Sequence, residues 1–359
     1  MSYNRDKTIT IVGCGGFIGS HLLERILDTT DFIVHGFDID FRKINHLLGN
    51  ERLDFHKTDM HDSSVFESVK KSGTVISLAA LCNPSLYNTV PLEVIESNIS
   101  GNLELLKACC DQKSRFIYFS TSEVYGRTVS SIAGEPGDSE KDLLREDSSP
   151  LIMGPVRVQR WSYAASKQII ERLIYAYGFE KGLDYTILRP FNFIGPRMDF
   201  IPGVDGEGIP RVLACFMDAL LNNKPLKLVD GGVNRRCFTY IGDAIDAVMA
   251  VLGRPDDSRR EIFNIGNPSN EITINDLACL MIKLYKEVRP EFSGKLYDIQ
   301  KVSSVDFYGQ GYEDSDRRLP DIRKACERLR WVPGTNLADS LRITIKAYVD
   351  QYGNRVSQK

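Results

Sequence analysis

The sequence predicts an α/β protein that begins with a doubly wound parallel sheet and continues into a smaller second α/β domain. Short apolar or β-branched runs alternate with longer stretches of helical period, such as Phe17–Leu27 and Leu92–Cys110. Near-continuous apolar strands separated by crossover helices indicate a parallel sheet with helices on both faces. The expected strands are Ile9–Val12, Phe32–Phe37, Leu53–His56, Thr74–Leu78, Phe116–Phe119 and Tyr185–Leu188.

The second domain is expected to start where this alternation ends, after Arg189-Pro190. Gly- and Pro-rich turns follow, and then helices with isolated short strands such as Leu226–Val229 and Ile262–Ile265. We therefore expect one domain over residues 1–190, completed by a segment returning near 233–260, and a second domain over 191–359. Because ligands of open α/β sheets bind beyond the carboxyl ends of the strands, the second domain should cover that edge.

One connection is unusually long. Roughly forty residues separate the strand that ends near Phe119 from the helical stretch that starts near Tyr163, and they include Gly134–Asp138. Structureless loops longer than about 15 residues are uncommon and are usually functional or disordered. We expect this connection to be a mobile cover over a functional site.

The composition of the 359 residues argues against several classes of protein. The formal charge is only −3 and no run of five basic residues occurs, which argues against a nucleic-acid partner. No apolar stretch approaches the 18 or so residues of a membrane span. The polar N-terminus leads directly into an apolar strand without the pattern of a signal peptide, so we expect a cytoplasmic protein.

The eight cysteines are scattered along the chain. They form no Cys-x-x-Cys pair and have no His at metal-ligand spacing, so no metal site is predicted. Most of them are expected to be small buried side chains in a reducing compartment. They are Cys14, Cys82, Cys109, Cys110, Cys215, Cys237, Cys279 and Cys326.

The first strand is followed by a glycine-rich turn, with glycines at 13, 16 and 19, and then by a helix that begins at Phe17 and Ile18. Such glycines let the backbone approach a pyrophosphate, and the helix N-terminus offers free N–H groups. This is the signature of a Rossmann dinucleotide site, and it nominates Gly13, Gly16, Phe17, Ile18 and Gly19 as cofactor contacts.

Acidic residues after the next two strands refine this cofactor site. Asp38 ends the second strand, where a carboxylate can accept a hydrogen bond from a ribose 2′-hydroxyl and repel a 2′-phosphate. NAD is therefore favoured over NADP, although Arg42 leaves NADP open. Asp59 follows the third strand and is either an adenine contact or a solvated turn residue.

Tyr163 and Lys167 are four residues apart at the start of a helical stretch, so they share one face of a helix. A tyrosine with its ordinary pKa near 10 is a poor base at neutral pH, and a nearby cation favours its phenolate. The strand ending at Phe119 leads into Thr121-Ser122-Glu123, a polar cluster at a strand's carboxyl end. Together these residues predict proton-transfer chemistry next to the dinucleotide, with Tyr163 and Lys167 also contacting it.

These motifs, with Arg189-Pro190-Phe191-Asn192, resemble the extended short-chain dehydrogenase/reductase family over nearly the whole chain. Longer segments resemble its UDP-glucuronate decarboxylase group, which includes the UDP-apiose/UDP-xylose synthases and a bacterial polymyxin-resistance decarboxylase. The most similar segment to the synthases runs from Met198 to Gly206 and continues through Pro210–Phe216. The other segments are Arg160–Tyr163, Phe191–Asp199, Pro225–Gly232 and Tyr308–Tyr312.

The resemblance implies a chemistry for UDP-glucuronate. Tyr163 would take the proton of the sugar 4-hydroxyl while NAD accepts the C4 hydride, and the resulting 4-ketone makes the carboxylate a β-keto acid that can lose carbon dioxide. Glu123 and Arg318 would assist decarboxylation and proton return, and Thr121 would bind the sugar hydroxyl. The implied nucleotide-sugar contacts are Tyr87, Arg160, Asn192, Arg211, Lys227, Arg236 and Tyr312.

Some of these implied roles have plain alternatives. Arg236 could be a surface cation and Lys227 a charge at a strand end, although an arginine fork suits phosphate oxygens. Cys82 matches a cysteine of the apiose/xylose synthases, whose ring contraction is thought to use two thiols, but Ser122 stands where those synthases have the second one. Cys82 could also be a small packing residue at the end of a strand.

The expected function is thus NAD-dependent decarboxylation of UDP-glucuronate with re-reduction to UDP-apiose or UDP-xylose. One alternative enzyme would release UDP-4-keto-pentose and NADH, and an alternative of another class is a non-catalytic nucleotide-sensing protein. The family resemblance also implies a homodimer, packed through the helices near Leu92–Cys110 and Tyr163–Glu180, although plain core packing would give the same apolar pattern.

Overall fold

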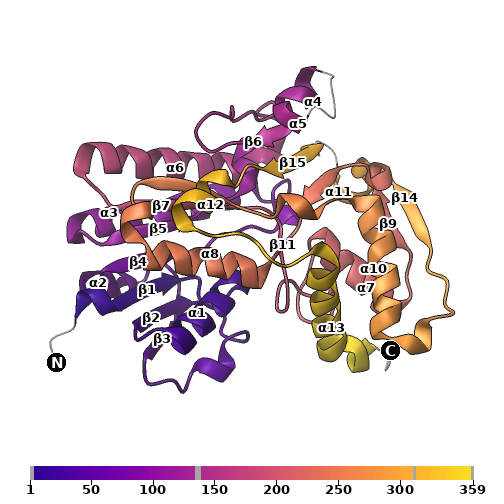
Figure 1. Ribbon diagram of the computed structural model, residues 1–359, viewed down its shortest axis with the longest axis horizontal. Helices are drawn as coiled ribbons and strands as arrows, with labels where there is room; N and C mark the ends of the chain where they lie inside the picture. The colour runs from indigo at the N-terminus through magenta and orange to yellow at the C-terminus, as the bar shows by residue number, and fades with distance from the viewer. Residues whose placement is uncertain (1–3, 134–138, 310–312, 357–359) are drawn as a thin grey trace.

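The computed structural model describes residues 4–133, 139–309 and 313–356, and its centre is a seven-stranded parallel sheet (Figure 1). The strand order is β12-β7-β5-β4-β1-β2-β3, which confirms the predicted doubly wound α/β fold. The order reverses between β1 and β4, and such a switch point opens a crevice for ligands. The strands are β1 (Thr8–Val12), β2 (Ile33–Asp38), β3 (Leu53–Lys57), β4 (Thr74–Ser77), β5 (Arg115–Phe119), β7 (Tyr185–Pro190) and β12 (Glu261–Ile265).

Helices cover both faces of this sheet because alternate strand residues point to opposite sides. Ile76 and Ile117 lie in a core with α1 (Phe17–Thr29) and α8 (Ile241–Gly253). Val75 and Phe116 lie in a second core on the other side. The helices of that second face are α2 (Ser63–Lys71), α3 (Pro91–Gln112) and α6 (Ser162–Lys181), and α3 packs along α6.

The outermost strand, β12, corrects one expectation. The run Ile262–Ile265 was assigned to the second domain, but it pairs with β7 in the central sheet, with Phe263 beside Leu188. The returning segment expected near 233–260 contributes α8, and the strand follows directly after it. A four-residue apolar run has the same appearance in any sheet, so the sequence does not reveal its pairing partner.

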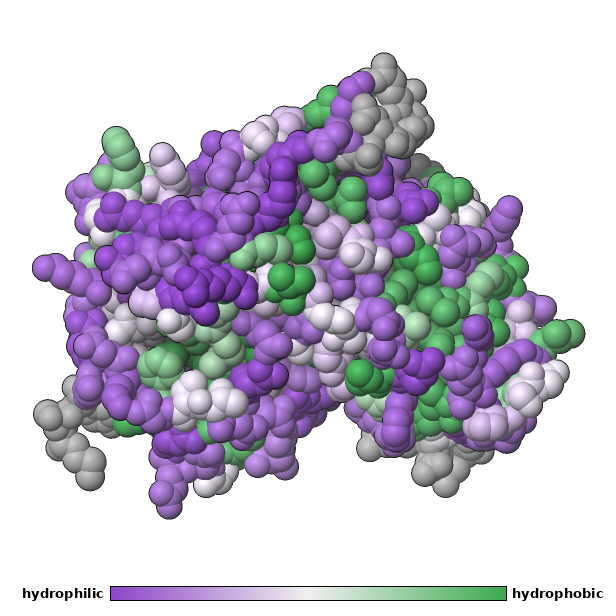
Figure 2. Space-filling model, viewed as in Figure 1, coloured by the Kyte–Doolittle hydropathy of each residue, from purple (hydrophilic) through white to green (hydrophobic). Residues whose placement is uncertain are grey.

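The part of the chain beyond β7 contains a helical group that appears on the right of Figure 1. There α7 (Val212–Asn222), α10 (Ile274–Val288) and α13 (Leu337–Val356) share a core with β9 (Leu226–Val229). Figure 2 shows hydrophobic residues gathered over this part, whereas the face over the central sheet is mostly hydrophilic. No helix within the described ranges has the length and hydropathy to cross a bilayer.

Three small sheets complete the fold. They pair β9 with β14 (Ile299–Val302), β8 (Phe193–Ile194) with β11 (Thr239–Tyr240), and join β13 (Glu271–Thr273), β10 (Arg235–Cys237), β15 (Arg317–Pro320) and β6 (Leu143–Leu144). Short helices link these elements: α9 (Pro255–Ser258), α11 (Ser304–Tyr308), α12 (Arg323–Leu329), and the 3₁₀ turns η1 (Arg5–Lys7), η2 (Asn45–Leu47), η3 (Pro84–Leu86), η6 (Asp230–Gly232), η7 (Pro268–Asn270) and η8 (Pro290–Phe292).

The long connection after β5 is not the cover without secondary structure that the sequence suggested. Its described parts hold η4 (Ser122–Tyr125), α4 (Val129–Ala133), α5 (Ser139–Asp142), β6 and η5 (Gln159–Trp161). The buried Asn264 amide donates to the Leu144 carbonyl at 2.8 Å, and β6 pairs with β15, so the connection is anchored to the body of the protein. Residues Gly134–Asp138 lie outside the described residues.

Candidate active site

A cavity of about 860 Å³ lies at the carboxyl ends of β1, β4 and β5, and residues from β9, β10 and β15 line its other side. It brings together every predicted site residue except Tyr312, which lies outside the described residues. The predicted residues that line it are Gly13, Gly16, Phe17, Ile18, Gly19, Asp38, Asp59, Cys82, Tyr87, Thr121, Glu123, Arg160, Tyr163, Lys167, Asn192, Arg211, Lys227, Arg236 and Arg318.

The glycine turn between β1 and α1 is a backbone cradle with no room for a side chain at Gly13 or Gly15. Gly13 has a φ of +90°, and a Cβ there would lie 2.6 Å from the Ala79 nitrogen. A Cβ on Gly15 would lie 1.8 Å from the Asp40 carbonyl oxygen. Gly16 is the N-cap of α1 and makes no side-chain cap, and the first residues of the helix, Phe17 and Ile18, line the cavity. The cradle therefore fits the pyrophosphate of a dinucleotide.

Asp38 lies at the rim of this cradle. Its carboxylate accepts hydrogen bonds from the Gly15 N–H at 2.8 Å and the Asp40 N–H at 2.9 Å. Burial raises the pKa of Asp38, and these backbone donors partly oppose the rise. Arg42 is the residue because of which the sequence did not exclude NADP as the cofactor. Its guanidinium forms an ion pair with Asp40 at 2.6 Å.

Two other side chains belong to the same end of the cavity. Asp59 lines the cavity and also accepts a hydrogen bond from the His61 N–H at 2.9 Å, so its two predicted roles are compatible. Lys43 lines the cavity as well, and burial lowers the pKa of its ammonium group. Sequence reasoning missed Lys43 because it lies in a polar loop that resembles an ordinary solvated segment.

Tyr163 and Lys167 lie in the first two turns of α6 and line the cavity, as their spacing predicts. The Tyr163 ring stacks on Tyr87, with centroids 5.2 Å apart and an interplanar angle of 9°. The Lys167 ammonium donates to the Phe119 carbonyl at 2.9 Å and lies 5.9 Å from the centroid of the Tyr163 ring. Lys167 is therefore held by the end of β5 and lies beside the tyrosine.

The electrostatic environment of Tyr163 differs from the simple expectation. Burial raises its pKa well above the ordinary value, and the nearby Cys82 and Glu123 add to the rise. Burial also lowers the pKa of Lys167 to about 8. The effect of burial therefore outweighs the effect of the nearby cations on the Tyr163 phenol.

Glu123 faces two arginines next to this pair. The Arg160 guanidinium donates to both of its carboxylate oxygens at 2.7 and 3.2 Å, and Arg318 donates at 3.4 Å. Burial alone would raise the pKa of Glu123, but the two guanidinium groups outweigh it and keep the pKa below its ordinary value. The Thr121 hydroxyl caps the same turn by accepting from the Glu123 N–H at 3.2 Å. At neutral pH Glu123 is therefore a carboxylate.

Asp314 is the main charged residue that the sequence analysis missed. Its carboxylate lies 2.7 Å from Arg236, 2.7 Å from Arg318 and 3.7 Å from Arg160. In the sequence it stands in Glu313-Asp314-Ser315-Asp316, which looks like a solvated charge run. Its role emerges only when β15 returns beside β10 and places Arg318 opposite Arg236.

The cysteines are less buried than the expectation that most of them are packed in the interior, since Cys110, Cys215 and Cys326 are half-buried. Cys14, Cys109 and Cys237 are buried, but Cys82 and Cys279 are exposed. Cys82 is exposed and lines the cavity, so it is not the packed residue at the end of a strand that the sequence offered as an alternative. Ser122 is buried and lines the same cavity.

The residues assigned to the nucleotide end approach from the second part of the chain. Arg236 is buried, which excludes the alternative of a surface cation. Arg211 pairs with Asp199 at 3.0 Å, and the Asn192 amide donates to the Cys237 carbonyl at 3.3 Å. Lys227 is an exposed residue of β9, and its ammonium lies 6.0 Å from the centroid of the Phe307 ring.

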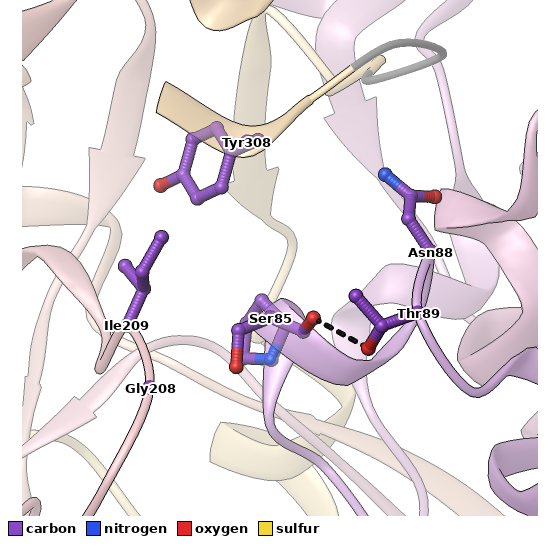
Figure 3. Close-up of a pocket in the computed structure, with 7 residues that line it drawn as sticks. Ser85, Asn88, Thr89, Gly208, Ile209 and Tyr308 are labelled. Carbon is purple, nitrogen blue, oxygen red and sulfur yellow. Dashed lines mark hydrogen bonds between the residues drawn. The ribbon is translucent and has the colours of Figure 1, made fainter. Parts of the chain in front are cut away.

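A smaller cavity of about 330 Å³ adjoins this end and shares Pro84 and Tyr308 with the main one. Figure 3 shows Ser85 and Thr89 on one side of it, Ile209 on the other and Tyr308 above them. The Thr89 hydroxyl donates to the Ser85 carbonyl at 3.1 Å. Among the described residues, no charged side chain lines this smaller cavity.

The model of the NAD dependent epimerase/dehydratase family matches residues 9–266, which span the glycine turn, the Tyr163/Lys167 pair and β12. The chain belongs to this family. The match confirms the predicted resemblance and the prediction of NAD as cofactor, and the glycine cradle with Asp38 at its rim fits that dinucleotide.

Curated members of the family are similar over nearly the full length. UDP-D-apiose/UDP-D-xylose synthase 1 of Arabidopsis thaliana is 46% identical, covering 98% of this chain and 93% of the relative. The UDP-D-apiose/UDP-D-xylose synthase of Oryza sativa subsp. japonica is also 46% identical, covering 98% and 92%.

Solved structures of the family share the fold. The PbgP3 protein of Burkholderia pseudomallei superposes with a TM-score of 0.82 at 33% identity, covering 98% of both chains. UDP-glucuronic acid 4-epimerase of Bacillus cereus, solved with UDP-glucuronic acid and NAD, has a TM-score of 0.78 at 26% identity and covers 96% of this chain and 100% of that one.

Proposed function

We propose that this protein is an NAD-dependent UDP-glucuronate decarboxylase of the UDP-apiose/UDP-xylose synthase type. The observation that carries the proposal is the full-length similarity to the plant synthases, joined to a cavity that places Tyr163, Lys167 and Glu123 beside an arginine cluster. NAD, when bound, accepts a hydride from the sugar, returns it later and adds the positive charge of its nicotinamide ring.

The chain's own residues supply the proton transfers and the binding. Tyr163 Oη takes the proton from the sugar 4-hydroxyl, and the Thr121 hydroxyl orients that sugar. Loss of carbon dioxide from the resulting β-keto acid leaves an enolate, whose negative charge lies on the C4 oxygen beside Tyr163. C5 then takes up a proton that comes from solvent and is relayed by the Glu123 carboxylate, and the proton held by Tyr163 goes back to the C4 oxygen on re-reduction. The ion pairs of Glu123 with Arg160 and Arg318 hold it in position.

The nucleotide part of the substrate is assigned to the other end of the cavity. Arg211 and Lys227 supply positive charge for the pyrophosphate, because guanidinium and ammonium groups pair well with phosphate oxygens. Arg236 lies between the two ends of the cavity, since it also pairs with Asp314 at 2.7 Å. Tyr87, Asn192 and Tyr312 complete the proposed substrate contacts.

The decisive experiment combines the protein with UDP-glucuronate and NAD and follows carbon dioxide, NADH and the NMR spectrum of the product. We expect carbon dioxide release without lasting NADH, and a pentose bound to UDP. Stoichiometric NADH with a 4-keto-pentose would favour the alternative oxidative decarboxylase. Absence of carbon dioxide would reject both enzymes and favour a nucleotide-sensing protein.

The same NMR experiment addresses the pentose. Cys82 is exposed in the cavity and supports ring contraction to UDP-apiose, whereas Ser122 replaces the second thiol of the plant synthases. A branched furanose and a xylopyranose give different spectra, so the product reveals whether one thiol is sufficient. Replacement of Cys82 by Ser is expected to reduce the branched product selectively.

We also propose a cytoplasmic homodimer. Apolar side chains are exposed along α6, with Ile169 at 46%, Tyr175 at 61% and Phe179 at 83%, and Leu92 is 66% exposed on the neighbouring α3. Large exposed apolar side chains on two neighbouring helices favour an interface at this face. We expect Phe179→Glu to shift the protein from dimer to monomer in sedimentation velocity, with Val332→Glu, another exposed apolar position, as the control.

A further inference from the structure

Five charged side chains form one buried network at the junction of the two parts of the chain. Glu123 lies in η4, directly after the central strand β5. Arg236 lies on β10, Arg318 on β15 and Asp314 just before β15. Arg160 joins Glu123 to Asp314. Three guanidinium groups and two carboxylates give the network a net charge of +1.

The network lies next to the reacting end of the cavity. The Arg160 guanidinium carbon is 5.2 Å from the centroid of the Tyr87 ring, and Tyr87 stacks on Tyr163. All five groups line the main cavity. A uronate carboxylate bound near Glu123 would therefore meet arginines whose charge Asp314 partly neutralises.

The chemistry of decarboxylation makes that neutralisation useful. When the bond between C5 and the carboxylate breaks, its electron pair stays on the sugar and the negative charge moves to the C4 oxygen, while carbon dioxide leaves as a neutral molecule. Strong positive charge around the carboxylate stabilises the ground state more than the transition state, and such binding does not raise kcat.

We propose that Asp314 is a positioning residue that limits the attraction of Arg160, Arg236 and Arg318 for the substrate carboxylate, so that affinity for UDP-glucuronate is restrained and decarboxylation is faster. The proposal rests on the proposed function. In this proposal Asp314 orients the three arginines and also lowers the net positive charge around the substrate carboxylate. Because Asp314 and Glu123 each cancel one guanidinium charge, one net positive charge remains to bind the carboxylate of the substrate.

The test compares Asp314→Asn with wild type and with Asp316→Asn. The amide keeps the shape of Asp314 and removes its charge, and Asp316 is an exposed carboxylate two residues away that does not line the cavity. We expect Asp314→Asn to lower both KM and kcat for UDP-glucuronate by about tenfold, because one charge is gained near the substrate carboxylate. Asp316→Asn should leave both constants unchanged.

Binding to UDP-xylose, which lacks the carboxylate, should change much less in the Asp314→Asn variant than binding to UDP-glucuronate. A raised KM would overturn the proposal, because it would indicate that the arginines are misplaced. Unchanged KM and kcat would also overturn it, because Asp314 would then have no role in the reaction. If the asparagine variant fails to fold, Asp314→Ala is assayed with increasing formate, which should raise KM and kcat together. No response to formate would count against the proposal.

The reaction of the wild-type protein distinguishes failure of the proposed function from failure of the role given to Asp314. Loss of carbon dioxide from UDP-glucuronate in wild type tests the proposed function independently of Asp314. A wild type that decarboxylates, combined with an Asp314→Asn variant of unchanged KM and kcat, would leave the function standing and reject the charge-balancing role.

Discussion

At the scale of single residues, Tyr163 is only 8% exposed and lies between the aromatic ring of Tyr87 and the ammonium group of Lys167. Burial, Cys82 and Glu123 all raise the pKa of its phenol. The neutral phenol is therefore favoured in the chain by itself, and a cation placed beside the ring opposes that preference.

Replacement of Tyr163 by Phe is expected to lower kcat by about 10² to 10⁴, because it removes one positioned proton-transfer group. NAD affinity should change little, since the glycine cradle is intact. Stopped-flow measurement of hydride transfer from UDP-glucuronate would show the loss. Tyr175→Phe on the same helix is the matched control because Tyr175 is 61% exposed, and an equal loss there would contradict the assignment.

Lys167 should make the stability of the protein depend on pH in a defined direction. Its pKa is about 8 in the folded chain because of burial, against an ordinary value of 10.5. Below pH 8 both folded and unfolded chains hold the proton, and the folded chain bears the cost of a buried charge. Between pH 8 and 10.5 the folded chain releases the proton first, so the free energy of unfolding rises by up to about 3 kcal/mol.

The Lys167→Met variant lacks this gain. We therefore expect the difference in the free energy of unfolding, wild type minus variant, to increase from pH 8 to pH 10 in urea titrations of the chain without nucleotide. Lys107→Met, at an exposed position of α3, should show no such increase relative to wild type. A difference that stays flat across this range would contradict the shifted pKa.

At the scale of elements, the turn between β1 and α1 depends on close contact between backbones. A Cβ at Gly15 would lie 1.8 Å from the Asp40 carbonyl oxygen, a separation that requires the backbone to move. We expect Gly15→Ala to lower the free energy of unfolding by more than about 2 kcal/mol and to weaken NAD binding at least tenfold. Urea unfolding and an NAD titration would measure both effects.

Gly49 provides the matched control for that substitution. A Cβ at Gly49 would meet nothing within 4 Å. Gly49→Ala should therefore change the free energy of unfolding by no more than about 0.5 kcal/mol. If Gly15→Ala behaved like Gly49→Ala, the cradle would be looser than the contacts imply.

The elements that the sequence predicts well are those whose signals are local. The strands from Ile9–Val12 to Tyr185–Leu188, the glycine turn and the Tyr163/Lys167 pair each occupy a short window. Asp314 and β12 were missed or misplaced because their partners are distant. Arg236 and Asp314 are 78 positions apart, and no pattern in either segment indicates the other.

At the scale of the whole molecule, the chain passes from the central sheet into the second part and returns before it ends. The strand β12 pairs with β7, and α8 packs against α1 in the core of the first face. The first domain, proposed over residues 1–190 and completed near 233–260, therefore needs β12 as well as α8 for its core.

A chain truncated after Pro190 is expected to be unable to fold into a stable monomer. It would leave β7 as an open, apolar edge strand and would expose the face of α1 that α8 covers, and such edges favour aggregation. Circular dichroism and sedimentation of residues 1–190 would measure this. A cooperative, monomeric 1–190 fragment would contradict the expectation, and the full chain is the control.

The place of β12 also has a consequence for the order of events during synthesis. Seventy residues, 191–260, separate the last residue of β7 from the first residue of β12. A ribosome that adds about 5 to 20 residues per second needs about 4 to 14 seconds for that segment. During this interval β7 is an unpaired edge strand of the nascent sheet. The chain is therefore exposed to aggregation through this edge until β12 has been synthesised.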